Sequence, residues 1–350
     1  MRCGASLNRN DMHFIIVGAG AIGSYVGGRL AAAGESVSLV ARPYQLEALQ
    51  NLALRVTDLD GFAADVPSNK LHLALSFQTA YTKLPADARS NAVVLLCVKG
   101  GATSHAAAEI AACVDEGTVV ISLQNGVENI DRIKSAAPHV QALAGMVPYN
   151  VVMKTGSHVH RATAGKVQLE ASSQSNDIAA RFNAAGIRVG VTSDMKSVQW
   201  GKLLLNLNNP INALSNVPLL DELLGRNFRV VLATLQQEAL SAMGCEGITP
   251  AQLAAASPRA MTRILRLPNF IFTRLAPKML RMDPAARSSM WDDVQRGRVT
   301  EVDDLCGAVV RLAAKHGKPA PVNAKMCALI AALKKGDQWT GRQLRQELGV

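Results

Sequence analysis

A glycine-rich segment near the start of the chain constrains its fold more than any other feature. The segment Gly18-Ala19-Gly20-Ala21-Ile22-Gly23 follows an apolar run over residues 13–17. It precedes a predicted helix over residues 24–33, which ends at Gly34. A second apolar run covers residues 37–40. In such a strand, turn and helix, the three glycines permit a tight turn, close approach to a pyrophosphate and close helix–strand packing. We therefore predict a βαβ unit in which all six residues bind a dinucleotide. The alternative is a glycine-rich turn without a ligand.

The end of the second apolar run indicates which dinucleotide is bound. A site for NAD usually has Asp or Glu there, which binds the ribose 2′-hydroxyl. This chain has Ala41 and Arg42 instead, and its next carboxylate is Glu47, which should lie on the following helix. A guanidinium can pair with the 2′-phosphate of NADP. We therefore expect NADP(H) as cofactor and Arg42 as one of its ligands; the alternative is a solvated surface arginine.

Later apolar runs extend the predicted sheet. Residues 92–98 and 118–123 have the apolar character of buried parallel strands, and residues 102–112 predict the helix between them. Lys99 directly follows the first of these strands and Asn125 comes just after the second, where ligands bind in open parallel sheets. We expect both residues to reach the cofactor. Taken singly, each could also be an ordinary surface lysine or an ordinary Asn-Gly turn.

The character of the chain changes in its second half. Residues 148–191 are turn-rich and predict antiparallel strands at the edge of the sheet, whereas helical patterns dominate from Ser193 onward. We therefore predict an α/β protein: an N-terminal Rossmann-type parallel sheet domain followed by an all-helical C-terminal domain. The expected boundaries are a disordered leader over residues 1–11, a NADP-binding domain over 12–192 and a helical substrate and dimerisation domain over 193–350.

Composition excludes several other classes. The apolar fraction of 49% argues against disorder, and the aromatic fraction of 4% argues against a nucleic-acid reader built on base stacking. No run of 18 apolar residues predicts a membrane span, no signal peptide precedes the first strand, and no Cys or His spacing predicts a metal site. We expect a cytoplasmic protein that binds neither nucleic acid nor membrane. The net charge of +10 lies almost wholly in residues 257–350. This basic region could create a positive field over a binding cleft, or it could be a solvated helical surface.

A leucine-rich helix in the second half carries candidate chemistry. Lys202 and Asn206 are four residues apart and share one face of this helix, beside Leu203 to Leu205. A partly desolvated lysine has a lowered pKa and can donate a proton. The alternative is a lysine that extends to solvent and an asparagine that caps the helix before Pro210.

Two further patterns have structural explanations of their own. Ser289 with Asp292, and Thr300 with Asp303, resemble capping boxes. Glu301 would then lie at the start of the helix that runs to about residue 316. Neither pattern requires a function.

Taken together, these residues resemble the ketopantoate reductase (2-dehydropantoate 2-reductase) family, which has a 6-phosphogluconate dehydrogenase-like fold. The similarity spans roughly residues 12–335. It rests on the glycine-rich segment with Arg42, on Val98-Lys99, on Gln124-Asn125-Gly126, on the segment from Trp200 to Asn206, and on the segment from Ser288 to Glu301.

The resemblance implies a reaction and a role for each candidate residue. The reaction would be the NADPH-dependent reduction of 2-dehydropantoate to pantoate, with Lys202 as proton donor to the keto oxygen. Glu301 would lie beside the lysine and the cofactor ribose, and Asn125 would touch both ribose and substrate. Asn206 and Ser289 would bind the substrate. By family analogy, the helical domain could form a homodimer.

The sequence departs from the family at three places. The second substrate asparagine is usual four residues after the first, where this chain has Pro210; we take Asn209 instead. Lys99 is followed by Gly100-Gly101 without the usual polar residue, and residues 249–287 are longer and more basic than the family requires. Two alternatives therefore stay open: an NADP-dependent reductase of another branched 2-oxo acid, and a non-catalytic NADP-binding regulator.

Overall fold

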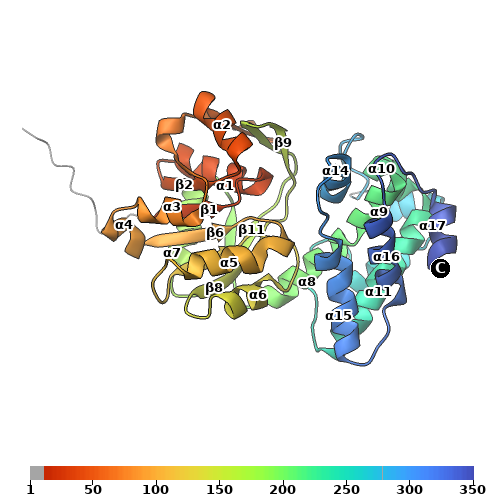
Figure 1. Ribbon diagram of the computed structural model, residues 1–350. Helices are drawn as coiled ribbons and strands as arrows, with labels where there is room; N and C mark the ends of the chain where they lie inside the picture. The colour runs from red at the N-terminus through yellow and green to blue at the C-terminus, as the bar shows by residue number, and fades with distance from the viewer. Residues whose placement is uncertain (1–11, 278) are drawn as a thin grey trace, which may run out of the picture. The chain divides into compact units, whose positions relative to one another are not determined.

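A computed structural model describes residues 12–277 and 279–350 (Figure 1). The leader predicted for residues 1–11 lies outside the described residues. Contacts between residues divide the described chain into two compact units. Residues 12–124 and 128–195 form the first unit, and residues 125–127 and 196–350 form the second. We expected the domain boundary after residue 192, which is slightly before the observed boundary after residue 195. We also expected residues 125–127 to belong to the first domain, whereas they pack with the second unit.

The first unit is built on an eight-stranded sheet with the strand order β12-β11-β8-β7-β6-β1-β2-β5. Neighbouring strands from β8 to β5 are parallel, whereas β8 and β11 are antiparallel. The chain adds β2 on one side of β1 and β6 on the other, which is the topology of a Rossmann fold and confirms the predicted fold class. The strands are β1 (His13–Val17), β2 (Ser36–Val40), β5 (His72–Ala74), β6 (Ala92–Leu96), β7 (Val119–Ser122), β8 (Gln141–Met146), β11 (Val167–Glu170) and β12 (Val189–Thr192).

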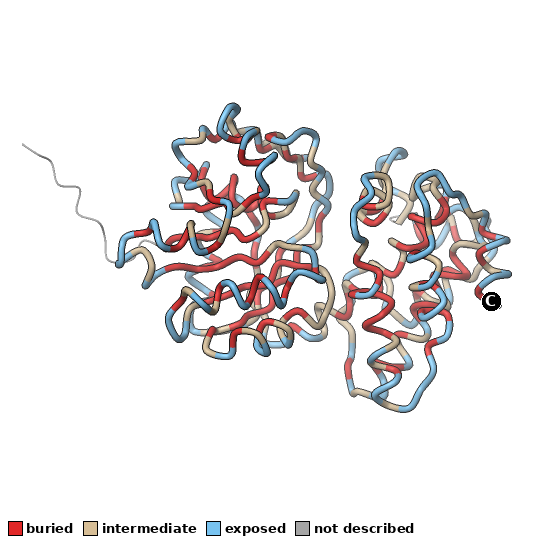
Figure 2. The backbone as a smooth tube through the Cα atoms, viewed as in Figure 1, coloured by how far each residue is buried: buried red, intermediate tan, exposed pale blue. Residues whose placement is uncertain are grey.

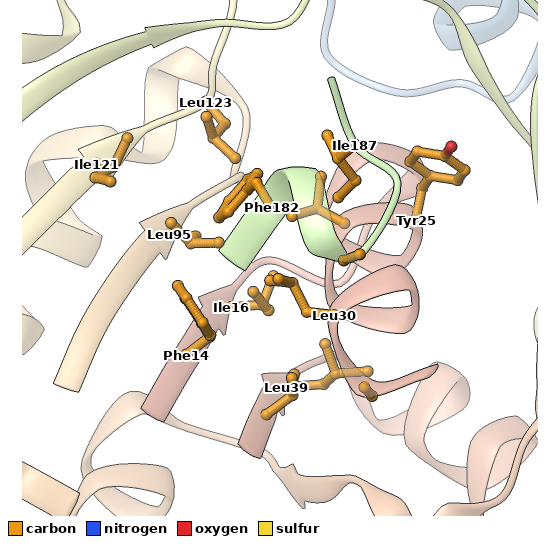
Figure 3. Close-up of a cluster of buried hydrophobic side chains, with 14 of the residues drawn as sticks. Phe14, Ile16, Tyr25, Leu30, Leu39, Leu95, Ile121, Leu123, Phe182 and Ile187 are labelled. Atoms are coloured by element: carbon orange, nitrogen blue, oxygen red, sulfur yellow. The ribbon is translucent and has the colours of Figure 1, made fainter. Parts of the chain in front are cut away.

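Helices cover both faces of this sheet, so its central strands are buried along their length (Figure 2). Successive side chains of β1 alternate between two cores: Phe14 and Ile16 face one, and Ile15 and Val17 face the other. The first core lies against α1, α2 and α7, and Figure 3 shows Phe14 and Ile16 within it. The second core lies against α3, α5 and α6. The helices of this unit are α1 (Ala21–Ala32), α2 (Pro43–Asn51), α3 (Phe77–Thr82), α4 (Ala86–Ser90), α5 (Thr103–Ala111), α6 (Asn129–Ala136) and α7 (Ser175–Ala184).

The antiparallel strands expected within residues 148–191 lie in two different sheets, which corrects part of the prediction. β11 extends the main sheet as expected. In contrast, β9 (Val151–Thr155) and β10 (His158–Arg161) join β3 (Leu54–Asp58) and β4 (Ala63–Val66) in a separate four-stranded sheet of order β4-β3-β10-β9. The pairing of β10 with β3 connects segments about a hundred residues apart, so local sequence patterns cannot reveal it.

The second unit is helical throughout its regular structure, as predicted. Its long central helix, α11, packs against α12, α15, α16 and α17 around a single apolar core. Within the part of the chain that the structure describes, no helix is long and apolar enough to cross a membrane. The helices are α8 (Met195–Asn206), α9 (Asn208–Ser215), α10 (Leu219–Leu224), α11 (Arg226–Cys245), α12 (Pro258–Leu265), α13 (Asn269–Leu275), α14 (Ser289–Gln295), the π-helix η3 (Asp303–Gly307), α15 (Ala308–Lys315), α16 (Pro321–Ala332) and α17 (Gly341–Leu348).

The helix break expected at Pro210 occurs earlier. α8 ends at Asn206, and Pro210 lies within the first turn of α9. Proline is tolerated in the first turn because its missing N–H has no partner within the helix there. The break therefore falls at Leu207, between the two asparagine-containing segments.

Candidate active site

The glycine-rich loop connects β1 to α1 in the first unit, and two of its glycines are required by sterics. Gly18 has φ +98°, and a Cβ at this position would lie 2.8 Å from the backbone nitrogen of Val98. A Cβ at Gly23 would lie 2.2 Å from the carbonyl oxygen of Gly18. The backbone nitrogens of Gly18 and Ala19 donate to the carbonyl of Val40, at 3.2 and 3.1 Å. The loop is thereby fixed between β2 and the chain that follows β6.

Gly20 differs from its two neighbours in the motif, because nothing lies within 4 Å of a Cβ built on it. It is exposed and is the N-cap residue of α1, with no side chain capping the helix. Backbone N–H groups at an uncapped helix N-terminus are a binding site for phosphate. The open space over Gly20 and the closed space at Gly18 and Gly23 are what a pyrophosphate between loop and helix requires, so these residues fit a dinucleotide.

Arg42 follows β2 and is the N-cap residue of α2, with its side chain exposed. Glu47 lies on α2, as expected, so no carboxylate stands between the end of β2 and that helix. Lys99 occupies the corresponding place after β6, at the start of a short 3₁₀ turn, and is also exposed. Both cations therefore lie at the carboxyl ends of parallel strands, the edge at which open sheets bind ligands.

In the second unit, Lys202, Asn125 and Glu301 form a hydrogen-bonded chain. Lys202 Nζ donates to Asn125 Oδ1 at 2.9 Å, and Asn125 Nδ2 donates to Glu301 Oε2 at 3.0 Å. Lys202 lies on α8. Glu301 comes directly before the helical segment that starts at Val302 and continues into η3. Residues 125–127 pack with this unit although their neighbours in sequence belong to the first. Three segments far apart in sequence thus meet at one polar cluster.

Burial lowers the pKa of Lys202 to about 8, although the nearby Glu301 carboxylate acts in the opposite direction. Lys202 is partly buried, the neighbouring Leu203 and Leu204 belong to the helical core, and Glu301 is itself only 8% exposed. Desolvation disfavours the ammonium, so it releases its proton more readily than a surface lysine does. Lys202 therefore has the property of a general acid that works near neutral pH.

The remaining predicted substrate residues lie on three elements of the second unit. Asn206 ends α8, Asn209 lies in the first turn of α9, and Ser289 is the first residue of α14; all three are partly buried. The capping box predicted with Ser289 is wrong in detail, because Ser288 is the N-cap residue and accepts from the backbone nitrogen of Trp291 at 3.1 Å. Ser289 is therefore not the residue that caps this helix. Thr300 likewise caps no helix, since Val302 precedes η3.

A buried network that the sequence did not reveal joins α9 to α14. Asn212 is fully buried, and its Oδ1 accepts from the backbone nitrogen of Ser288 at 2.8 Å. Its Nδ2 donates to Glu222 at 2.8 Å, and burial raises the pKa of Glu222 to about 8. Ser288 Oγ also donates to the carbonyl of Asn209 at 3.3 Å. The network holds Asn209 and Ser289 on adjoining helices; an asparagine within an apolar helix was its only signal in the sequence.

Gln124 is a second residue that sequence reasoning left without a role. Its Nε2 donates to the carbonyl of Val98 at 2.9 Å and to Thr103 Oγ1 at 2.7 Å. Within the first unit, Gln124 therefore fixes the turn that carries Lys99. A polar residue directly after an apolar strand was the signal that could have found it.

Comparison with known proteins identifies the family. The family model for ketopantoate reductase PanE/ApbA matches residues 14–174 of the sequence. The family model for the C-terminal part of ketopantoate reductase PanE/ApbA matches residues 194–334. The chain belongs to the ketopantoate reductase family. This confirms the resemblance predicted from the motifs, and makes the protein an oxidoreductase with a dinucleotide-binding fold.

Individual members are similar over almost their whole length. The 2-dehydropantoate 2-reductase of Archaeoglobus fulgidus is 30% identical over 327 residues, which cover 92% of this chain and 97% of that protein. A crystal structure of a PanE/ApbA family ketopantoate reductase from Ralstonia eutropha is 27% identical, with a TM-score of 0.74 over 96% of this chain and 100% of that one. The ternary structure of D-mandelate dehydrogenase with NADH and anilino(oxo)acetate, at 17% identity and a TM-score of 0.71, has the same fold.

Proposed function

We propose that this ketopantoate reductase family member reduces 2-dehydropantoate to pantoate with NADPH, a step toward pantothenate and coenzyme A. The observation that carries the proposal is the chain from Lys202 through Asn125 to Glu301. A half-buried lysine with a pKa near 8 is matched to donating a proton at neutral pH. The names of the similar proteins support 2-dehydropantoate as the substrate.

The chemistry divides between the cofactor and the protein. When bound, NADPH supplies the hydride that reduces the keto carbon. Lys202 holds its ammonium toward the keto oxygen, stabilises the negative charge that develops there and then gives up a proton to form the hydroxyl. Asn125 orients the ammonium through Oδ1, and Glu301 orients Asn125 in turn. The resulting neutral amine of Lys202 takes up a proton from water before the next turnover.

The other predicted residues bind and position the two reactants in this proposal. Asn206 and Asn209 hold the substrate beside the lysine, and the hydroxyl of Ser289 binds its carboxylate. The loop from Gly18 to Gly23 holds the pyrophosphate, Arg42 pairs with the 2′-phosphate, and Lys99 contacts the cofactor near its pyrophosphate or ribose. We assign cofactor binding to residues 12–192, and substrate binding and homodimer formation to residues 193–350. A cytoplasmic location is part of the same proposal.

The proposal is tested by NADPH oxidation with 2-dehydropantoate beside a panel of branched 2-oxo acids that lack its terminal hydroxyl. We expect the highest kcat/KM with 2-dehydropantoate. Turnover of another acid without turnover of 2-dehydropantoate would establish the alternative reductase. Tight NADPH binding without oxidation by any acid of the panel would favour the non-catalytic regulator.

A further inference from the structure

Two cysteines of the helical unit lie side by side next to the segment that carries Glu301. Cys306 lies on η3 and Cys327 on α16, two helices that pack against each other, and a hydrogen bond joins the two thiols. The five cysteines within the described residues are all reduced. Cys306 is fully buried, whereas Cys327 is partly exposed. The pair therefore combines one thiol that solutes can reach with one that they cannot.

One member of this pair, Cys327, also contacts the backbone beside Glu301. Cys327 Sγ contacts the carbonyl oxygen of Val302 at 3.9 Å, the residue that follows Glu301 in the chain. The intervening residues form a π-helix, a conformation that is rare and often marks functional positions. A change in the position of η3 relative to α16 would therefore be passed directly to Glu301.

We propose that Cys306 and Cys327 are a redox modification site, at which a peroxide forms a disulfide that reversibly displaces Glu301 and inhibits the enzyme. The inhibition rests on the proposed function, because Glu301 acts there by orienting Asn125 toward Lys202. Disulfide formation itself does not depend on what the enzyme reduces.

The chemistry assigns different roles to the two thiols. The hydrogen bond from Cys306 lowers the pKa of Cys327, and the same bond together with burial raises the pKa of Cys306. Arg311 also favours the Cys327 thiolate, whereas burial and Asp303 oppose it. A partly exposed thiol of lowered pKa beside a second thiol is the arrangement of a peroxide-sensitive cysteine and its resolving partner.

The oxidation proceeds in two balanced steps. The Cys327 thiolate attacks one oxygen of hydrogen peroxide; the O–O bond breaks, hydroxide leaves and takes up a proton, and Cys327 becomes a sulfenic acid. The Cys306 sulfur then attacks the Cys327 sulfur, the S–O bond breaks, and water leaves with the thiol proton. Two thiols and one peroxide thus give one disulfide and two waters.

The disulfide changes the local geometry. Bonded sulfurs are about 2.05 Å apart, much closer than two hydrogen-bonded thiols, so η3 and α16 must approach each other. The bond also removes the S–H that Cys327 offers to Val302. A misplacement of about 1 Å in a positioning group can lower the rate by roughly 100-fold.

The test uses the full chain, reduced, freed of reductant and treated with hydrogen peroxide. Alkylation and peptide mass spectrometry then identify the bonded pair, while NADPH-dependent activity is followed before and after a dithiol reductant is added. We expect a Cys306–Cys327 disulfide and a loss of activity by about 10-fold or more that the reductant reverses. Cys327→Ser should abolish both the disulfide and the reversible loss, whereas the exposed Cys245→Ser should change neither.

Two outcomes would overturn the proposal in different ways. If peroxide leaves Cys306 and Cys327 as thiols, or joins either to another cysteine, the modification site is wrong whatever the activity. A mapped disulfide with unchanged turnover would instead disprove the link to Glu301. If untreated protein turns over no 2-oxo acid, the proposed function fails, and the mass-spectrometric result still decides the modification site.

Discussion

Asn125 accepts a hydrogen bond from Lys202, with Nζ and Oδ1 2.9 Å apart, although 77 residues separate the two in sequence. An amide suits this position because it has an acceptor and a donor at one end of the side chain. Its oxygen faces an ammonium, and its nitrogen donates to the Glu301 carboxylate. An aspartate would offer no donor to Glu301. The amide of Asn125 thus lies between the Lys202 cation and the Glu301 anion. This arrangement fixes the position of the lysine and requires an amide at residue 125.

Replacement of the lysine is the most direct test of its role. We predict that Lys202→Ala lowers kcat by about 100-fold or more, the scale expected for a positioned general acid, and leaves the Kd for NADPH nearly unchanged. Lys196→Ala is a matched control, because Lys196 lies on the same helix and pairs with Glu246 at 3.6 Å on the surface. Steady-state kinetics and NADPH titration measure both effects. Equal turnover in the two variants would remove Lys202 from the mechanism.

The pH dependence of turnover tests the environment of the same lysine. Since Lys202 acts as an acid and its pKa is lowered to about 8, we predict that kcat falls as pH rises through about 8. Glu301 acts to raise this pKa, so Glu301→Gln should move the alkaline limb to lower pH. Glutamine keeps an oxygen that can accept from Asn125, so the geometry is retained. A limb that stays in place or moves to higher pH in the variant would contradict the assignment.

The glycine-rich loop offers a matched pair of substitutions that separate folding from binding. Gly23→Ala places a Cβ 2.2 Å from the Gly18 carbonyl oxygen, so we predict a loss of stability of about 1–3 kcal/mol, seen as a lower Tm. Gly20→Ala meets no atom within 4 Å, and Gly20 has φ −67°, so its Tm should be nearly unchanged. Its KM for NADPH should instead rise by roughly 10-fold, because the methyl group occupies the pyrophosphate's place. If Gly20→Ala lowered the Tm and left the KM for NADPH unchanged, no dinucleotide would bind over Gly20.

Local sequence patterns were sufficient for the parts of the fold that depend on neighbours in the chain. The strand at residues 13–17 was predicted to the residue. The helix predicted over residues 24–33 spans Ala21–Ala32, so its end was predicted to within one residue and its first turn was missed. Its N-terminus was missed because Gly20 supplies no capping side chain that the sequence could signal. The four-stranded sheet was missed because β3 and β10 pair across about a hundred residues.

The candidate site follows the same division. The spacing of Lys202 and Asn206 is local, and it placed both on one helix. The partnership of Lys202 with Asn125 and Glu301 is not local, and only the resemblance to a family suggested that these residues belong together. Asn212 carried no such signal, since a buried asparagine is distinguished from an exposed one only by the packing around it.

Arg42 provides the test of cofactor choice. If its guanidinium pairs with the 2′-phosphate, Arg42→Ala removes charge-assisted hydrogen bonds worth about 1.5–3 kcal/mol, which corresponds to a rise in KM for NADPH of roughly 10- to 100-fold. The KM for NADH should not change, because NADH has no 2′-phosphate, and kcat should be retained. Arg188→Ala is the control, since Arg188 is also an exposed arginine of the first unit. Kinetics with both cofactors measure the preference directly. A parallel rise in both KM values would mean that Arg42 contributes to general binding of the dinucleotide. If neither KM value changed, Arg42 would not be the residue that selects NADP.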